Sequence, residues 1–267
     1  MAPPPLPQEI IDKIIDQFSE TARRAESRAS NKRALVPLSM VARAWRERSQ
    51  KHLFSVMKFR VPLPLDITEA DLDELGPVFS LTGDLNIDGH FRTLSQFNPA
   101  IIAFLRCFRN LKSLSFSNWR LRQLDPRLVS TCLSHLGETV VHLRLEGGVS
   151  TGSLIYLAST FPRLRVLKIF ITTDCDEEPG DIVSEEELPI VGCFQGCLSL
   201  FGLTEQHNAF LLFLSSTSPK FDKIYIHTCS VGDGLGKLLD SSAPSLESLE
   251  LHAEGNNPEG ELTDSWS

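Results

Sequence analysis

Hydrophobic positions recur in one order over most of the chain: a run of the form Leu-x-x-Leu-x-Leu, a polar break, and then an amphipathic stretch. The run predicts a short strand with one buried face, and the stretch predicts a helix. The clear copies begin at Leu111, Val140, Leu164, Phe221 and Leu246, with a weak first copy at Leu85-x-Ile87 and a degenerate one at 198–203. Because neither element buries its apolar face alone, consecutive units are expected to stack into a parallel sheet backed by helices, an α/β fold.

The expected helices between these strands are short. They cover residues 99–108, 126–136, 153–161, 208–214 and 235–239. Ahead of the first strand, Thr68 to Leu75 predicts a helix with Thr68 as its N-cap, ended by Gly76-Pro77. Two alternating prolines, Pro62 and Pro64, predict a stiff extended linker before that helix.

The first 54 residues have a helical pattern instead. Pro7 suits the first position of a helix, and the isoleucines that follow fall on one side of a 3.6-residue period. Further on, Trp45 and Ser49 lie on one side of a second predicted helix, which directs Arg48 and its other basic residues to water. The segment is therefore expected to be a small helical module.

This module resembles the F-box, through Leu6-Pro7, Glu9-Ile10-Ile11, Ile14-Ile15 and the run Leu38-Ser39-x-Val41-x-Arg43-x-Trp45. The resemblance implies a trihelical domain that docks on the Skp-family adaptor of SCF cullin-RING ubiquitin ligases. The adaptor-binding residues it implies are Leu6, Pro7, Ile10, Ile11, Ile14, Ile15, Leu38, Val41 and Trp45, with Trp45 expected to be largely internal. Two features depart from the family: a long polar connection over 19–33, and Pro37, which would kink or shorten the middle helix.

Repeats behind such a module resemble the F-box proteins with leucine-rich repeats, in the degenerate form common among fungal chains. The resemblance implies a non-enzymatic substrate receptor, in which a short irregular arc binds a protein substrate and other subunits transfer ubiquitin. The domains expected are residues 1–60 for the module, 61–67 for the linker and 68–267 for the repeats. The alternative is an F-box scaffold that acts outside a ubiquitin ligase; a hydrolase is the least favoured class.

Charge divides the chain in the same way. Residues 1–60 hold 12 Lys and Arg against 6 Asp and Glu, whereas residues 61–267 hold 14 against 28. An acidic body repels phosphates, so no nucleic-acid partner is expected. No secretory signal and no membrane span is recognisable, so an intracellular protein, cytoplasmic or nuclear, with reduced cysteines and no membrane contact is expected.

No pattern of catalytic, metal-binding or cofactor-binding residues is evident. Cys193 and Cys197 lack the further close pair that a zinc site needs, and Gly232 to Lys237 lacks the spacing of a phosphate-binding loop. Residues 174–187 carry eight acids and no base, which predicts a solvated insertion or a contact for a basic partner. Substrate contacts are expected at outward strand positions, namely Arg144, Arg165, Lys168, Lys223 and Tyr225.

Overall fold

The structure is a computed structural model that describes residues 7–24, 35–37, 40, 43–61, 69–89, 104–120, 133–171, 194–228 and 232–253. Within these ranges eight strands form one sheet in the order of the sequence, and every neighbouring pair is parallel. The strands are β1 (Val56–Val61), β2 (Asp84–Gly89), β3 (Ser113–Arg120), β4 (His142–Gly148), β5 (Val166–Ile171), β6 (Gln195–Leu203), β7 (Lys220–Thr228) and β8 (Ser248–Ala253).

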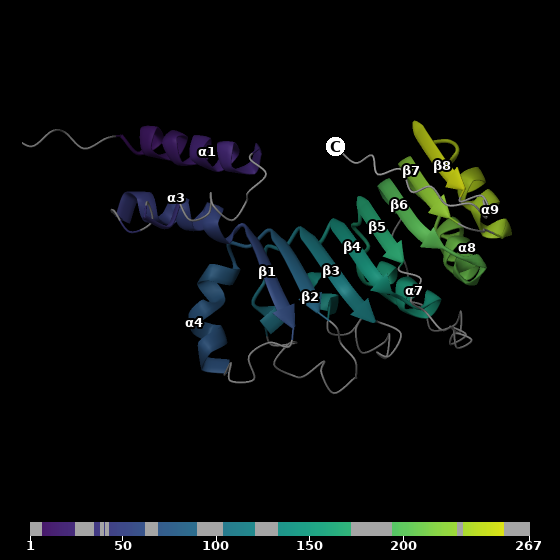
Figure 1. Ribbon diagram of the computed structural model, residues 1–267, viewed down its shortest axis with the longest axis horizontal. Coiled ribbons are helices and arrows are strands. Elements are labelled where there is room, and N and C mark those ends of the chain that lie inside the picture. The colour runs from purple at the N-terminus through teal and green to yellow at the C-terminus, as the bar shows by residue number, and fades with distance from the viewer. Residues whose placement is uncertain are drawn as a thin grey trace, which may run out of the picture.

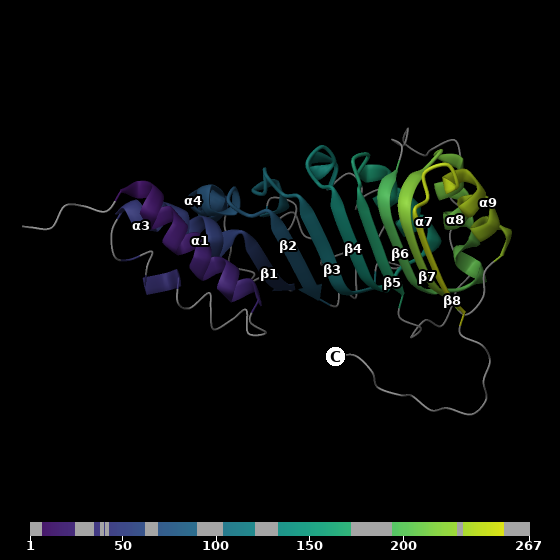
Figure 2. The ribbon, with the colours of Figure 1, turned by 90° about the horizontal axis from the view of Figure 1, so that it is seen from above.

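Helices connect these strands along one side of the sheet. They are α4 (Glu69–Phe79), α7 (Thr151–Thr160), α8 (Asn208–Ser216) and α9 (Asp233–Ser242), with short 3₁₀ turns at Ser134–Leu136 and Glu205–His207. Figure 1 shows the sheet curving from β1 to β8 with α7, α8 and α9 on its outer side, and Figure 2 shows the same strands from above. The expected α/β fold of parallel strands backed by helices is confirmed.

The register of the sheet aligns the apolar positions of successive repeats into two buried columns. The first column holds Leu85, Leu114, Leu143, Leu167, Leu198 and Ile224, and the second holds Ile87, Phe116, Leu145, Ile169, Leu200 and Ile226. Each of these side chains is at most 3% exposed. Residues 198–203 therefore contribute a full strand, although their apolar pattern is irregular.

Two elements differ from the sequence expectation. Val56–Val61 forms the first strand, with Met57 and Phe59 in register with Leu85 and Ile87, so the sheet begins before the prolines. In addition, α4 does not stop at Gly76-Pro77 but continues to Phe79. A proline in the last turn removes a single backbone donor, and Phe79 is buried against Phe59, so packing outweighs that loss.

The two ends of the core differ. At the β1 end, Phe59, Phe79, Phe104 and Phe108 form a cluster of rings with centroids 4.6 to 6.4 Å apart. At the β8 end, Leu249 and Leu251 pair with the last members of the two columns but are 45% and 49% exposed. Among the described residues, the apolar core is thus covered at its β1 end, whereas its β8 end is partly exposed to solvent.

Strand β6 contains two irregularities, each at a glycine. The pairing with β7 shifts at Gly196 and again at Gly202, where φ is +87° and +73°. A Cβ at Gly202 would overlap the Ile171 carbonyl oxygen of β5, and one at Gly196 would overlap that of Arg165. Glycine is required at both positions because the backbone is left-handed and the neighbouring strand lies too close.

Ahead of the sheet, α1 (Gln8–Arg24) packs against α3 (Arg43–Phe54), and residues 35–37 are helical. Pro37 is therefore compatible with a helical turn at this point, although the rest of the expected middle helix lies outside the described residues. The α1 and α3 pair lies beyond β1, at the end of the sheet away from β8 (Figure 1).

Candidate functional site

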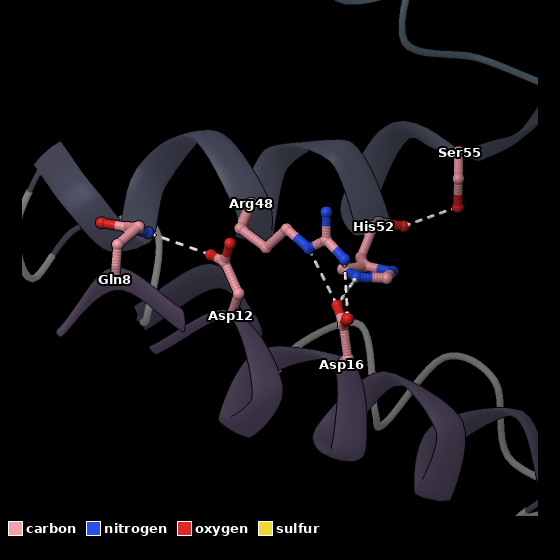
Figure 3. A network of polar contacts seen from close by, with 6 residues as sticks. All are labelled: Gln8, Asp12, Asp16, Arg48, His52 and Ser55. Atoms are coloured by element: carbon pink, nitrogen blue, oxygen red, sulfur yellow. Dashed lines mark hydrogen bonds and ion pairs between the residues drawn. The ribbon is translucent and has the colours of Figure 1, made fainter. Parts of the chain in front are cut away.

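Two surfaces of the molecule are candidates for binding, one on the α1 and α3 pair and one on the sheet. The first begins with a polar cluster that joins the two helices. Arg48 on α3 donates from Nε and Nη2 to the two oxygens of Asp16 on α1, at 2.9 and 2.6 Å, and His52 Nε2 lies 2.7 Å from Asp16 Oδ1. Figure 3 shows Asp16 facing both side chains across the gap between the helices.

This cluster changes the proton affinity of its members. Hydrogen bonds from Arg48, and to a lesser extent His52, lower the pKa of Asp16 to about 2, against the opposing effect of partial burial. The same contact raises the pKa of Arg48. The helical pattern predicts that Arg48 faces water, and its side chain is 33% exposed. The pairing with Asp16 was not predicted, because a residue 32 positions away is not visible in such a pattern.

Beneath the cluster the helices share a small apolar core. Ile11 and Ile15 on α1 and Leu35 are at most 5% exposed, and Trp45 and Leu53 on α3 pack against them. Ile11 and Ile15, which the sequence assigns to adaptor binding, therefore hold the two helices together. Trp45 is half-buried, in agreement with its expected internal position.

Other apolar side chains, on α1 and in the segment between α1 and α3, are exposed. Ile10 is 42% exposed and Met40 is 75% exposed, and Val36 is half exposed. Pro7 is exposed and Ile14 is half-buried. For brevity we call these three exposed apolar residues of the N-terminal part, Ile10, Val36 and Met40, the apolar patch. The remaining residues assigned to adaptor binding, Leu6, Leu38 and Val41, lie outside the described residues.

The second surface is the face of the sheet opposite α7, α8 and α9, which we call the open face. It is formed by strand residues that alternate with the two buried columns. Three of the five residues expected to bind substrate lie in one row across it, because Arg144, Lys168 and Tyr225 occupy equivalent positions on β4, β5 and β7. Lys223 lies two residues earlier on β7, and Arg165 is exposed just before β5.

The next row along the strands is aromatic. Phe170 stacks on Phe201 with ring centroids 4.5 Å apart and planes 4° apart, and Phe201 is stacked with His227 at 6.3 Å. His227 in turn lies 6.1 Å from His252. The guanidinium of Arg144 covers the other face of Phe170, with its carbon 4.6 Å from the ring centroid. We call these four rings, from β5 to β8, the aromatic row.

The aromatic row was not predicted, although the sequence contains a signal for it. In four successive repeats the residue directly after the second column position is Phe or His, as in Ile169-Phe170, Leu200-Phe201, Ile226-His227 and Leu251-His252. The repetition becomes informative only when the repeats are aligned in register. Because stacked rings cover one another's faces, the row presents mainly ring edges, which carry partial positive charge.

The described residues offer little for other chemistry. They contain no group of three or more His, Cys, Asp or Glu side chains placed to hold a metal ion. Cys197 lies on strand β6 rather than on a helix, with its Sγ 3.8 Å from Ser199 Oγ, and Cys193 lies outside the described residues. Gly234, in the glycine-rich stretch, donates its N–H to Asn208 Oδ1 at 2.7 Å, which joins α9 to α8.

The acidic stretch 174–187 lies outside the described residues, so its expected role stays a prediction. Among the helices in the described ranges, none is both long enough and apolar enough to cross a bilayer. Comparison of the sequence with protein-family models found no matching family, and a search among curated proteins found no significant relative.

Proposed function

We propose that this protein is a substrate-receptor subunit of an SCF-type cullin-RING ubiquitin ligase. In this proposal the α1 and α3 pair is an F-box that docks on a Skp-family adaptor, and the sheet is a short leucine-rich-repeat arc that binds a protein substrate on its open face. The protein itself performs no chemistry, and the other subunits transfer ubiquitin.

The observation that carries the proposal is the apolar patch. Burying Ile10 of α1 and Met40, which lies between α1 and α3, would gain free energy, yet both are exposed while Ile11 and Ile15 form the internal core. Several large apolar side chains exposed on one small helical unit are typical of a protein interface. The F-box resemblance of residues 6–45 supports a Skp-family adaptor as the protein that covers them.

The open face supports substrate binding on separate grounds. Its residues project from paired parallel strands over one continuous core, so their positions are fixed before a partner arrives. Aromatic and arginine side chains are enriched where interfaces are strongest, and the aromatic row with Arg144 provides both. Lys168 and Lys223 add positive charge beside it, which favours an acidic segment of the substrate.

Co-purification with variants in the apolar patch tests the docking step. Tagged protein is expected to retain the adaptor and cullin, and the double variant Ile10→Glu, Met40→Glu is expected to lose both. Leu75→Glu is the matched control, because Leu75 on α4 is also 42% exposed but lies outside the patch. Adaptor binding by the double variant would contradict the proposed interface, and adaptor without cullin would favour a scaffold outside a ligase.

Substrate binding is tested with a second pair of variants. Candidate substrates are the proteins that the wild type captures and that accumulate when it is absent. Their capture is compared between Phe201→Ala and Ser115→Ala. Both residues lie on the open face, but Ser115 is on β3, away from the aromatic row. Equal capture by the two variants would exclude the row from substrate binding.

A further inference from the structure

Strand β8 ends the sheet with an unpaired edge, in so far as the structure describes the chain. Its inner side pairs with β7, and no described strand pairs with its outer side. Figure 1 shows β8 at the end of the sheet farthest from α1 and α3. An uncovered strand edge readily pairs with another strand, and proteins usually cover it or place charges on it.

The side chains of β8 add an apolar reason for pairing. Leu249 and Leu251 continue the two buried columns, whose members on β2 to β7 are at most 3% exposed. On β8 the same positions are 45% and 49% exposed. A strand added beside β8 would extend the columns and remove these two leucines from water.

The residues of β8 indicate which strand could pair with its open edge. Glu247 N–H donates to Asp222 O on β7 at 2.8 Å. Because Ser248 is the partner of Lys223, its backbone groups face β7, as do those of Glu250 and His252. The direction of N–H and C=O alternates along a strand, so these groups of Leu249 and Leu251 point toward the open edge. Glu250 and His252 also share the open face, where His252 Nε2 lies 2.7 Å from Glu250 Oε1.

We propose that β8 pairs antiparallel with β8 of a second copy of this chain, around a two-fold axis at Leu251. Each Glu250 then lies opposite His252 of the other copy, and the two Leu251 side chains face each other. The outward-pointing backbone groups of the two Leu251 residues meet at the axis, as a hydrogen-bonded antiparallel pair requires. Opposite-charge or hydrogen-bonding side chains directly across a pair stabilise it.

Charge disfavours the neighbouring register, in which the axis lies at Glu250. In an antiparallel pair of β8 strands, residues opposite one another must have their side chains on the same face of the sheet. The two strands can therefore shift only so that the leucines stay opposite inward-facing residues and Glu250 stays opposite a Glu or His on the open face. Moving the axis to Glu250 places the two Glu250 carboxylates opposite each other, which is destabilising. The sequence Leu249-Glu250-Leu251-His252 is thus self-complementary with the axis at Leu251.

The full chain is tested by sedimentation velocity over a concentration series. The wild type is expected to pass from monomer to dimer, and Leu251→Lys is expected to remain monomeric. His252→Glu places carboxylates opposite Glu250 of the other copy, so the dissociation constant is expected to rise roughly tenfold. The double variant Glu250→Lys, His252→Glu restores opposite charges across the axis and is expected to recover wild-type association.

The variants are expected to leave the fold intact because the side chains of Glu250 and His252 are both more than half exposed, and thermal unfolding checks this. A double variant as weak as His252→Glu would overturn the proposed register, because an axis at position 250 would place the two introduced lysines opposite each other. A wild type that stays monomeric at every concentration would overturn the dimer. Ile10→Glu, Met40→Glu is expected to dimerise normally, since Ile10 is on α1, which lies at the other end of the sheet (Figure 1).

Discussion

The bulge at Gly202 gives the sharpest test of how this sequence specifies its sheet. Gly202 directly follows Phe201 of the aromatic row and allows β6 to shift register against β7 while Leu203 returns to the core. In Gly202→Ala, the new Cβ would overlap the carbonyl oxygen of Ile171 on β5, and the residue would keep a φ of +73°. We therefore expect this single methyl group to destabilise the sheet strongly.

The magnitude follows from two separate costs. A left-handed backbone costs a residue other than glycine about 1 to 2 kcal/mol. Moving the Ile171 carbonyl away from the added methyl group costs about 1 to 3 kcal/mol, as for other overpacked sites. Together they predict a loss of about 2 to 5 kcal/mol in the free energy of unfolding, which corresponds to a fall in Tm of about 4 to 20 °C for a domain of this size.

Urea unfolding followed by circular dichroism measures this loss, and Gly236→Ala is the control. Gly236 lies in α9, and a Cβ there would meet nothing within 4 Å. Alanine at that position is expected to raise stability by up to about 1 kcal/mol, because it is the better helix former. A free energy of unfolding of Gly202→Ala within about 0.5 kcal/mol of the wild-type value would be typical of a surface substitution. The left-handed bulge would then not be a required feature of β6.

Three further outcomes are expected. Asp16 has its pKa lowered from 3.8 to about 2 by Arg48, so its stabilisation of the helix pair is complete above pH 4 and is lost as the pH falls toward 2. Asp16→Asn should remove that pH dependence and cost about 1 kcal/mol, since the carboxylate is 41% exposed and solvent screens it; unchanged acid unfolding would refute this. Leu200→Ala should cost about 2 to 5 kcal/mol by chemical unfolding, because Leu200 is fully buried in the second column. Cys197→Ser should change stability by less than about 1 kcal/mol, and a larger loss would show that the thiol is a core group.

The sequence predicted those parts of the fold that local patterns determine. Each Leu-x-x-Leu-x-Leu run contains its own evidence for a strand, and short connections between similar units leave parallel stacking as the way to bury them. Strand β1 was missed because Met57-x-Phe59 lacks the leading leucine and directly follows the helix that ends at Phe54. The continuation of α4 was missed because burial of Phe79 is a tertiary effect.

Features that depend on register or on distant pairing could not be predicted from single segments. The pairing of Asp16 with Arg48 joins two helices across a polar connection, and many acid and base pairs were available on the pattern alone. The aromatic row needs the alignment of four strands before its members become neighbours. Among residues assigned to adaptor binding, Ile10 and Ile11 are adjacent in sequence, but one is exposed and the other buried.

The strict order of the strands fixes the length of peptide that the open face can hold. Neighbouring strands are spaced about 4.8 Å apart, so a row across eight strands is about 34 Å long. An extended peptide advances about 3.3 Å per residue, so about ten residues would span the whole row and about four would span the aromatic row. Because each strand pairs only with its neighbours in sequence, the gain or loss of one repeat changes this reach by one strand spacing and leaves the remaining positions in register.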